Sequence, residues 1–203
     1  MRSSISRAIA LPAFALVALA GRSVAAQQTA VQSTTTTTTT TVTTTVAAPA
    51  VGDVAPDFAL PWADGSGARA KPVALSSLRG KVVVLAFYPK DRTTGCTAEM
   101  TKFRDEYASL FGGDGVVVLP VSADSIDSHV SWASDAKFPF ALGSDVDLAV
   151  ADKYGSRMPG RPMAARTVFV IGKDGRVAYR EMKFNALSED AYKALASAVA
   201  AAR

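Results

Sequence analysis

Cysteine is nearly absent from this sequence: Cys96 is the only one in 203 residues. Without a second cysteine the chain cannot form an internal disulfide, which excludes a small domain held together by disulfide bridges. A Cys-x-x-Cys redox pair is also excluded, because the residue three positions after Cys96 is Glu99. Any redox cycle at Cys96 must therefore be completed by another molecule.

Histidine is equally scarce, since His129 is the only one in the chain. One histidine and one cysteine do not supply the usual ligand set of a zinc site, so we expect no metal and no other cofactor. His129 falls in a predicted helix that also carries Trp132. We expect its side chain to be structural or exposed.

A strong charge imbalance is missing as well. The 22 basic and 18 acidic residues give a net charge of +4. Three of the arginines (Arg2, Arg7 and Arg22) lie in the first 26 residues, so the remainder has 19 basic and 18 acidic residues, a net charge of +1. No cluster of lysine and arginine with interleaved aromatic residues occurs either, and we therefore expect no nucleic-acid partner.

Residues 1–26 have the pattern of a secretory signal peptide. A basic start is followed by an apolar run at 8–20 and by the small-residue sequence Ser23-Val24-Ala25-Ala26. The apolar run is shorter than the roughly 20 residues that span a bilayer. The pattern predicts export to the periplasm or the extracellular space, with a membrane tether as the alternative if the signal is not cleaved.

Residues 27–50 consist mainly of threonine, valine and alanine, with eight consecutive threonines at 34–41. The segment lacks the apolar period that would build a core face, so we predict a flexible linker. A threonine-rich strand is the alternative interpretation. A single folded domain is then expected at 51–203, which is long enough to bury a sizeable core.

Within 51–203, strand patterns alternate with helix patterns. Residues 81–88 are almost continuously apolar, which is typical of a central strand covered on both faces, and 116–121 are similar. Strands at 166–171 and 176–182 flank Gly172-Lys173-Asp174-Gly175, a hairpin signal. The order predicts an α/β fold with a mixed central β-sheet and helices on both faces. The other predicted elements are short strands at 55–60, 73–75 and 140–142 and helices at 94–111, 125–137, 147–154 and 188–202.

Cys96 lies at the start of the helix predicted at 94–111, which a turn connects to the central strand. A lone cysteine is more often a small buried apolar residue than a reactive one. Here, however, the free N–H groups and the positive end of the helix dipole favour the thiolate. The thiolate is the form that attacks electrophiles, so this context indicates a working thiol.

Pro89, Thr93 and Cys96 have the spacing of a peroxiredoxin motif: proline, three residues, threonine, two residues, cysteine. With Arg166 at the start of a late strand, the domain resembles the peroxiredoxins along nearly its whole length. It is most similar to the peroxiredoxin Q or bacterioferritin-comigratory-protein branch. The resemblance implies a thioredoxin-like fold and a thiol-dependent peroxidase that uses no cofactor.

The resemblance also implies the roles of four catalytic residues. Cys96 would attack hydrogen peroxide or an organic hydroperoxide and become a sulfenic acid. Thr93 offers a hydroxyl, and Arg166 a permanent positive charge that favours the thiolate and stabilises charge on oxygen. Pro89, with a fixed φ and no N–H, would shape the turn.

Taken singly, these residues have ordinary interpretations. Thr93 alone would be interpreted as a helix cap, and Arg166 alone as a surface charge. Three other arginines could supply the charge near the sulfur: Arg92, Arg157 and Arg161. Glu99 would ordinarily balance the helix dipole.

Many members of the branch carry a resolving cysteine five residues after the first, where this sequence has Thr101. The chain would therefore be a one-cysteine form, reduced by an external thiol such as a thioredoxin-like protein or a small thiol. The branch implies a monomer or a homodimer. The alternatives are an exported thioredoxin-fold disulfide carrier, which the missing Cys-x-x-Cys pair disfavours, and a non-catalytic binding domain.

Overall fold

The computed structural model describes residues 47–203. The predicted signal peptide and residues 27–46 of the predicted linker lie outside the described residues. The end of that linker packs on the domain, because the Arg180 guanidinium donates hydrogen bonds to the carbonyls of Ala48 and Pro49, both at 3.0 Å. Pro49 is also buried. The folded unit therefore includes residues just before 51, the boundary that composition suggested.

Seven strands form one sheet in the order β3-β2-β7-β6-β5-β8-β9. Strand β5 (Val82–Phe87) pairs in parallel with β6 (Val116–Ser122) and antiparallel with β8 (Thr167–Ile171). Every residue of β5 is buried, as its apolar run predicts. The sheet is thus mixed, and the predicted α/β fold is confirmed. The remaining strands of this sheet are β2 (Trp62–Asp64), β3 (Gly67–Ala68), β7 (Leu142–Ser144) and β9 (Val177–Glu181). Strands β1 (Ala59–Leu60) and β4 (Val73–Ala74) lie outside it.

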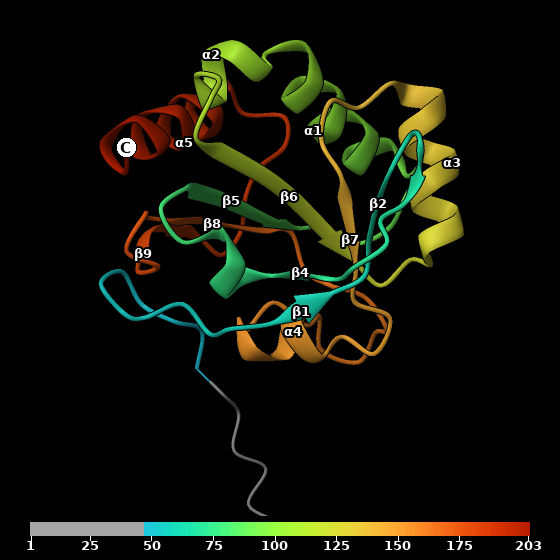
Figure 1. The fold of residues 1–203 in the computed structure, drawn as a ribbon, viewed down its shortest axis with the longest axis horizontal. Coiled ribbons are helices and arrows are strands. Elements are labelled where there is room, and N and C mark those ends of the chain that lie inside the picture. Colours follow the sequence, from blue (N-terminus) through green and yellow to red (C-terminus); the bar gives the residue numbers. More distant parts are fainter. Residues whose placement is uncertain (1–46) are drawn as a thin grey trace, which may run out of the picture. The chain divides into compact units, whose positions relative to one another are not determined.

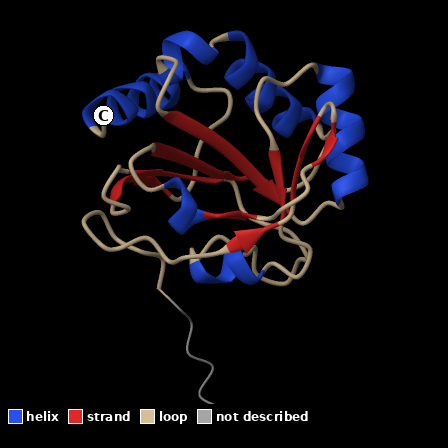
Figure 2. Ribbon diagram, in the orientation of Figure 1, coloured by secondary structure: helices blue, strands red, loops and turns tan. Residues whose placement is uncertain are grey.

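The helices are α1 (Thr94–Asp105), α2 (Tyr107–Phe111), α3 (Ile126–Ala136), α4 (Ala149–Lys153) and α5 (Glu189–Ala201), with a 3₁₀ helix η1 (Leu75–Leu78). They cover both faces of the sheet: α4 lies on one side and the other four α-helices on the opposite side (Figures 1 and 2). Side chains of a strand alternate between its faces. Accordingly, Val82, Val84 and Ala86 join the core under α1, α3 and α5, while the intervening residues of β5 join the core over α4.

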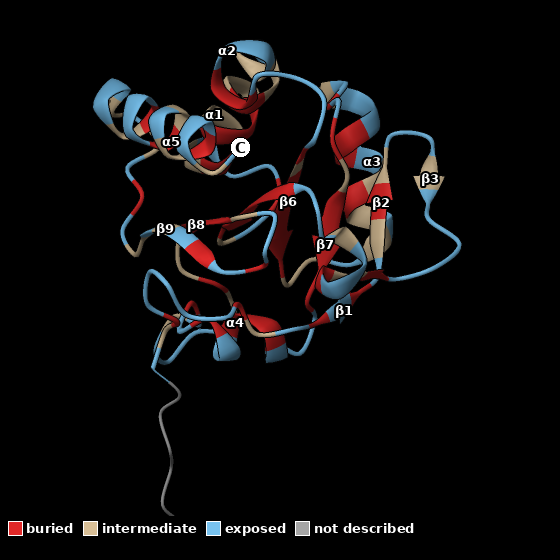
Figure 3. Ribbon diagram, turned by 60° about the vertical axis from the view of Figure 1, so that its left-hand side comes forward, coloured by how far each residue is buried: buried red, intermediate tan, exposed pale blue. Residues whose placement is uncertain are grey.

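The central strands β6 and β7 are buried between these layers, whereas the outer surfaces of α2 and α5 are exposed (Figure 3). Two of the helices have serine N-caps, since the side chains of Ser125 and Ser188 accept hydrogen bonds from the N–H groups of Ser128 and Ala191. None of the helices in residues 47–203 combines the length and the apolar character needed to cross a membrane.

Several elements differ from their predicted bounds, among them the strand predicted at 55–60, of which only Ala59–Leu60 forms β1. The single helix predicted at 94–111 is divided at Glu106 (φ −108°, ψ 23°) into α1 and α2. Hydrogen bonds from the Glu106 N–H to Lys102 (3.0 Å) and from the Leu110 N–H to Glu106 (2.8 Å) cross the division, so it is a local bend. The strand predicted at 140–142 begins only at residue 142, and Phe140 packs in the core against Phe138, with ring centroids 5.1 Å apart.

Candidate active site

Cys96 lies in the first turn of α1, directly beyond the C-terminal end of the central strand β5. Thr93 is the N-cap residue and has extended backbone angles (φ −76°, ψ 151°). The first helical hydrogen bond runs from the Thr97 N–H to the Thr93 carbonyl, at 2.8 Å. The preceding N–H groups, including that of Cys96, have no acceptor within the helix and can stabilise negative charge at this end.

Arg166 reaches the sulfur from the neighbouring strand. It immediately precedes β8, whose antiparallel register with β5 places Thr167 opposite Phe87, at the end of β5 from which the turn starts. Its Nη2 donates a hydrogen bond to Cys96 Sγ at 3.3 Å. The structure therefore brings Arg166 and Cys96 together, and the guanidinium places a permanent positive charge and a hydrogen-bond donor beside the sulfur.

The other candidate arginines are held elsewhere. Arg92 pairs with Asp135 at 2.6 Å, and Arg157 pairs with Asp152 at 2.7 Å. Arg161 is exposed. Within residues 47–203, no hydrogen bond joins any of these three arginines to Cys96, so Arg166 is the cation beside the sulfur.

Glu99 belongs to the site, although we expected it only to balance the helix dipole. It is fully buried and forms an ion pair with Arg166 through Nη1. Its Oε1 is buried and has no hydrogen-bond partner among the described residues. Burial raises the pKa of the Glu99 carboxyl to about 7, although the charge of Arg166 opposes the rise. The spacing of three residues from Cys96, which places both on one helix face, was the available signal.

Thr93 and Pro89 stand beside this cluster without a hydrogen bond to the sulfur. The exposed Thr93 donates its hydroxyl hydrogen to the Lys90 carbonyl at 3.0 Å, and it makes no side-chain cap. Its oxygen can therefore only accept a hydrogen bond from a substrate. Pro89 is half-buried in the turn between β5 and α1. This position fits a role in shaping the turn and gives no sign that Pro89 takes part directly in the chemistry.

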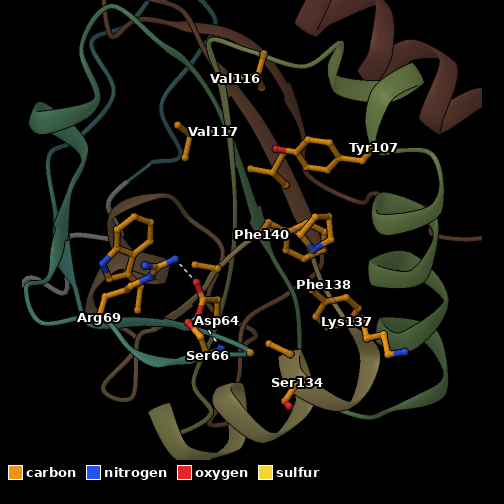
Figure 4. A pocket seen from close by; sticks show the side chains of 16 residues that line it. Asp64, Ser66, Arg69, Tyr107, Val116, Val117, Ser134, Lys137, Phe138 and Phe140 are labelled. Atoms are coloured by element: carbon orange, nitrogen blue, oxygen red, sulfur yellow. Dashed lines mark hydrogen bonds and ion pairs between the residues drawn. The ribbon is translucent and has the colours of Figure 1, made fainter.

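The sulfur itself is enclosed, because Cys96 has no exposed surface. A cavity of about 580 Å³, drawn in Figure 4, does not have Cys96 in its lining. That cavity is lined by Val116 and Val117 from the start of β6, by Tyr107 and Phe140, and by the Asp64–Arg69 ion pair. Since β5 and β6 are parallel, it lies at the opposite end of the sheet from Cys96.

No group of three or more histidine, cysteine, aspartate or glutamate side chains in residues 47–203 is arranged to hold a metal ion. The cluster instead places a fixed cation and free N–H groups around one cysteine sulfur. That combination suits attack on an electrophile whose leaving group takes up negative charge.

Comparison with known proteins agrees with this chemistry. Residues 51–180 match the AhpC/TSA family. A Coxiella burnetii protein named peroxiredoxin bcp is 39% identical over 134 residues, covering 63% of this chain and 85% of that protein. The chain belongs to the peroxiredoxin family. Peroxiredoxin Q of Sedum lineare is 37% identical over 132 residues, and the match spans 62% of this chain and 65% of that protein.

Solved peroxiredoxin structures confirm the predicted thioredoxin-like fold. Peroxidoxin BcpB from Mycobacterium tuberculosis has a TM-score of 0.64 and 32% identity, covering 76% of this chain and 99% of that protein. The bacterioferritin comigratory protein of Xanthomonas campestris has a TM-score of 0.60 and 28% identity, covering 72% and 92%. As a peroxiredoxin, the chain is a thiol-dependent peroxidase.

Proposed function

We propose that this chain is a one-cysteine peroxidase that reduces hydrogen peroxide and organic hydroperoxides. The Cys96 thiolate attacks one peroxide oxygen, a sulfur–oxygen bond forms and the oxygen–oxygen bond breaks. The products are a Cys96 sulfenic acid and a hydroxide or alkoxide, which takes up a proton to leave as water or an alcohol. The contact between Arg166 and Cys96 is the observation that carries this proposal. Organic peroxides are included because the Xanthomonas campestris relative is described as reducing alkyl peroxides.

Reduction of the sulfenic acid needs an external thiol, because the chain has no second cysteine. A first thiol condenses with the sulfenic acid, releasing water and forming a mixed disulfide; a second thiol then releases Cys96. We propose a thioredoxin-like protein or a small thiol as the donor. Since Cys96 is fully buried, the turn that carries it must move before a protein thiol can reach the sulfur.

The place of action is a second part of the proposal. The signal-peptide pattern of residues 1–26 supports export to the periplasm or the extracellular space, with residues 27–46 as the connection to the domain. We propose that the protein works there as a monomer or a homodimer. The mass of the protein recovered from its native host tests cleavage near residue 26, and light scattering of the purified domain tests its assembly.

The decisive experiment is stopped-flow measurement of sulfenic acid formation at Cys96 with hydrogen peroxide and with an organic hydroperoxide near neutral pH. A second-order rate constant orders of magnitude above that of a small free thiol is expected. The Cys96→Ser variant is the control and should give no signal. A rate equal to that of a free thiol would contradict the proposal and favour a carrier or binding role.

A further inference from the structure

A buried polar cluster lies beneath the turn that carries the reactive cysteine. Its centre is Asp91, between Pro89 and Cys96, whose side chain is 3% exposed. The Asp91 carboxylate accepts hydrogen bonds from the Tyr88 hydroxyl (2.7 Å), the Ser128 hydroxyl (2.6 Å) and His129 Nδ1 (2.9 Å). These contacts fasten the turn to β5 and to α3.

The main chain of Asp91 is fixed as well. Its N–H donates to the Asp124 carboxylate at 2.8 Å, and that carboxylate also accepts the Ser122 hydroxyl at 2.7 Å. Asp124 lies just beyond the end of β6. The turn is thus held at one residue through both its side chain and its backbone.

His129 is the least expected member of the cluster, because it is completely buried. Its Nδ1 faces the Asp91 carboxylate, and its Nε2 lies 3.2 Å from the Gly143 carbonyl oxygen. The Gly143 carbonyl is always an acceptor, and the Asp91 carboxylate can only accept when it is ionised. With Asp91 ionised, the two hydrogen bonds therefore require a proton on each ring nitrogen of His129. The geometry therefore fits an imidazolium.

Few polar groups surround Asp91 and His129. Asp91 comes from the turn, Asp124 from the end of β6, and Tyr88 from the end of β5, while β7 contributes the neutral Gly143 carbonyl. Burial by itself would raise the pKa of Asp91, but the hydrogen bonds from His129, Ser128 and Tyr88 and the charge of His129 hold it below its ordinary value. An ionised Asp91 facing a cationic His129 is consistent with these contacts.

The backbone beside Asp91 needs such an anchor. Arg92, the next residue, has φ 61°, in the left-handed region that non-glycine residues rarely adopt. Residues in such conformations persist where the surrounding contacts determine them. Arg92 is one position before Thr93, so a relaxation there would displace the N-terminus of α1 and the Cys96 sulfur.

We propose that Asp91 and the imidazolium of His129 form a buried ion pair that positions the catalytic turn and holds it closed. His129 and Asp91 are positioning residues, since they touch neither the sulfur nor the peroxide. The inference rests on the proposed function, because a closed turn is what presents Cys96 to Arg166. Opening of the same turn is what exposes the sulfenic acid to an external thiol.

The first test reads the protonation of His129 in the folded, reduced wild-type chain near neutral pH. Chemical shifts of the imidazole nitrogens identify protonated and unprotonated ring positions, and the signal is unambiguous because the chain has one histidine. The protein must carry no histidine tag. Protons on both nitrogens are expected. An unprotonated ring nitrogen would overturn the ion pair, and this test requires no variant to fold.

The second test compares two reagents in Asp91→Asn, His129→Gln and the milder Ser128→Ala. Hydrogen peroxide needs the assembled turn, whereas a bulky aromatic disulfide reaches the buried sulfur only when the turn opens. For the first two variants we expect a reaction with peroxide at least about tenfold slower and a reaction with the disulfide at least about tenfold faster. Ser128→Ala should change both rates in the same directions but less.

The control is Val177→Ala, which removes buried volume from β9 outside the cluster. Variants that slow both reagents together, or that merely reproduce the control, would overturn the positioning role. The double variant Asp91→Asn/His129→Gln should match the more affected single variant if the two residues act as a pair. A wild-type protein that reacts with peroxide no faster than a free thiol would refute the proposed function, while the nitrogen shifts would still decide the ion pair.

Discussion

Arg166 Nη2 lies 3.3 Å from Cys96 Sγ although the two residues are 70 positions apart in the sequence. The antiparallel pairing of β8 with β5 creates this proximity. The same guanidinium binds the Glu99 carboxylate through its other terminal nitrogen, so one planar group contacts two acidic partners. Lysine could supply the charge, but its single ammonium lacks this fork geometry.

Replacement of Arg166 should therefore distinguish the effect of its positive charge on the peroxide reaction from the effect of its fork-shaped guanidinium. Arg166→Ala is expected to slow the reaction of Cys96 with hydrogen peroxide by about 100-fold or more, because a donor to developing charge is lost. Arg166→Lys should give an intermediate rate. Stopped-flow rate constants at one pH check both variants, and Arg166→Lys with the wild-type rate would show that the fork is unnecessary.

Gly95 controls how closely Arg166 approaches. A β-carbon at this position would come 3.2 Å from Arg166 Nη2, closer than ordinary contact. Gly95→Ala should therefore push the guanidinium away from the sulfur and slow the peroxide reaction by about tenfold. Alanine is the better helix former by about 1 kcal/mol, so the stability to urea should not fall.

Thr101→Ala, a substitution in the same helix outside the site, serves as the control and should keep the wild-type rate. A Gly95→Ala protein that is equally stable and equally fast would mean that Arg166 adjusts at no cost. In that case the observed separation of Arg166 and Cys96 would not limit the rate.

Local pattern was enough to predict most of this architecture. The apolar run at 81–88 predicts the central strand, and the spacing of Pro89, Thr93 and Cys96 with the late Arg166 predicts the family and its reactive sulfur. The bend at Glu106 was not predicted, because helical hydrogen bonds continue across it and composition alone carries no signal of a change in direction.

Glu99 and His129 show where sequence reasoning stops. Glu99 looks like an ordinary first-turn acid until β8 brings Arg166 against it, and that contact spans 67 positions. His129 could be expected to be structural or exposed, but its burial depends on Asp91, 38 positions earlier. Long-range contacts of this kind depend on strand register for Arg166 and on the packing of α3 against the turn for His129, and a single sequence reveals neither.

Thr93 makes a separate prediction because its hydroxyl hydrogen is already used by the Lys90 carbonyl. Its oxygen can accept a hydrogen bond from the peroxide O–H and so orient the substrate. Thr93→Val is expected to slow sulfenic acid formation by about tenfold or more, whereas Thr93→Ser should stay near the wild-type rate. Equal rates for valine and serine, measured with the same peroxide, would limit Thr93 to shaping the turn.

The buried Glu99 carboxyl predicts a pH dependence of stability. Its pKa is about 7 in the folded protein, compared with 4.5 for an ordinary glutamate. The folded state therefore holds the proton more tightly than the unfolded state between these values, and stability is lost as the pH rises through this range. Glu99→Gln mimics the neutral form and lacks this loss, so its stability relative to wild type should increase by about 2–3 kcal/mol from about pH 5 to about pH 8.

Urea unfolding of the two proteins at both pH values measures this change, and Glu106→Gln, which removes a half-buried carboxylate paired with Lys102, is the matched control. A constant difference across the range would mean that Glu99 is already ionised at low pH and that its ion pair with Arg166 outweighs its burial. The peroxide rate of Glu99→Gln gives an independent reading. The amide oxygen can still accept a hydrogen bond from Arg166, so this variant should react faster than Glu99→Ala, which leaves the guanidinium unsupported.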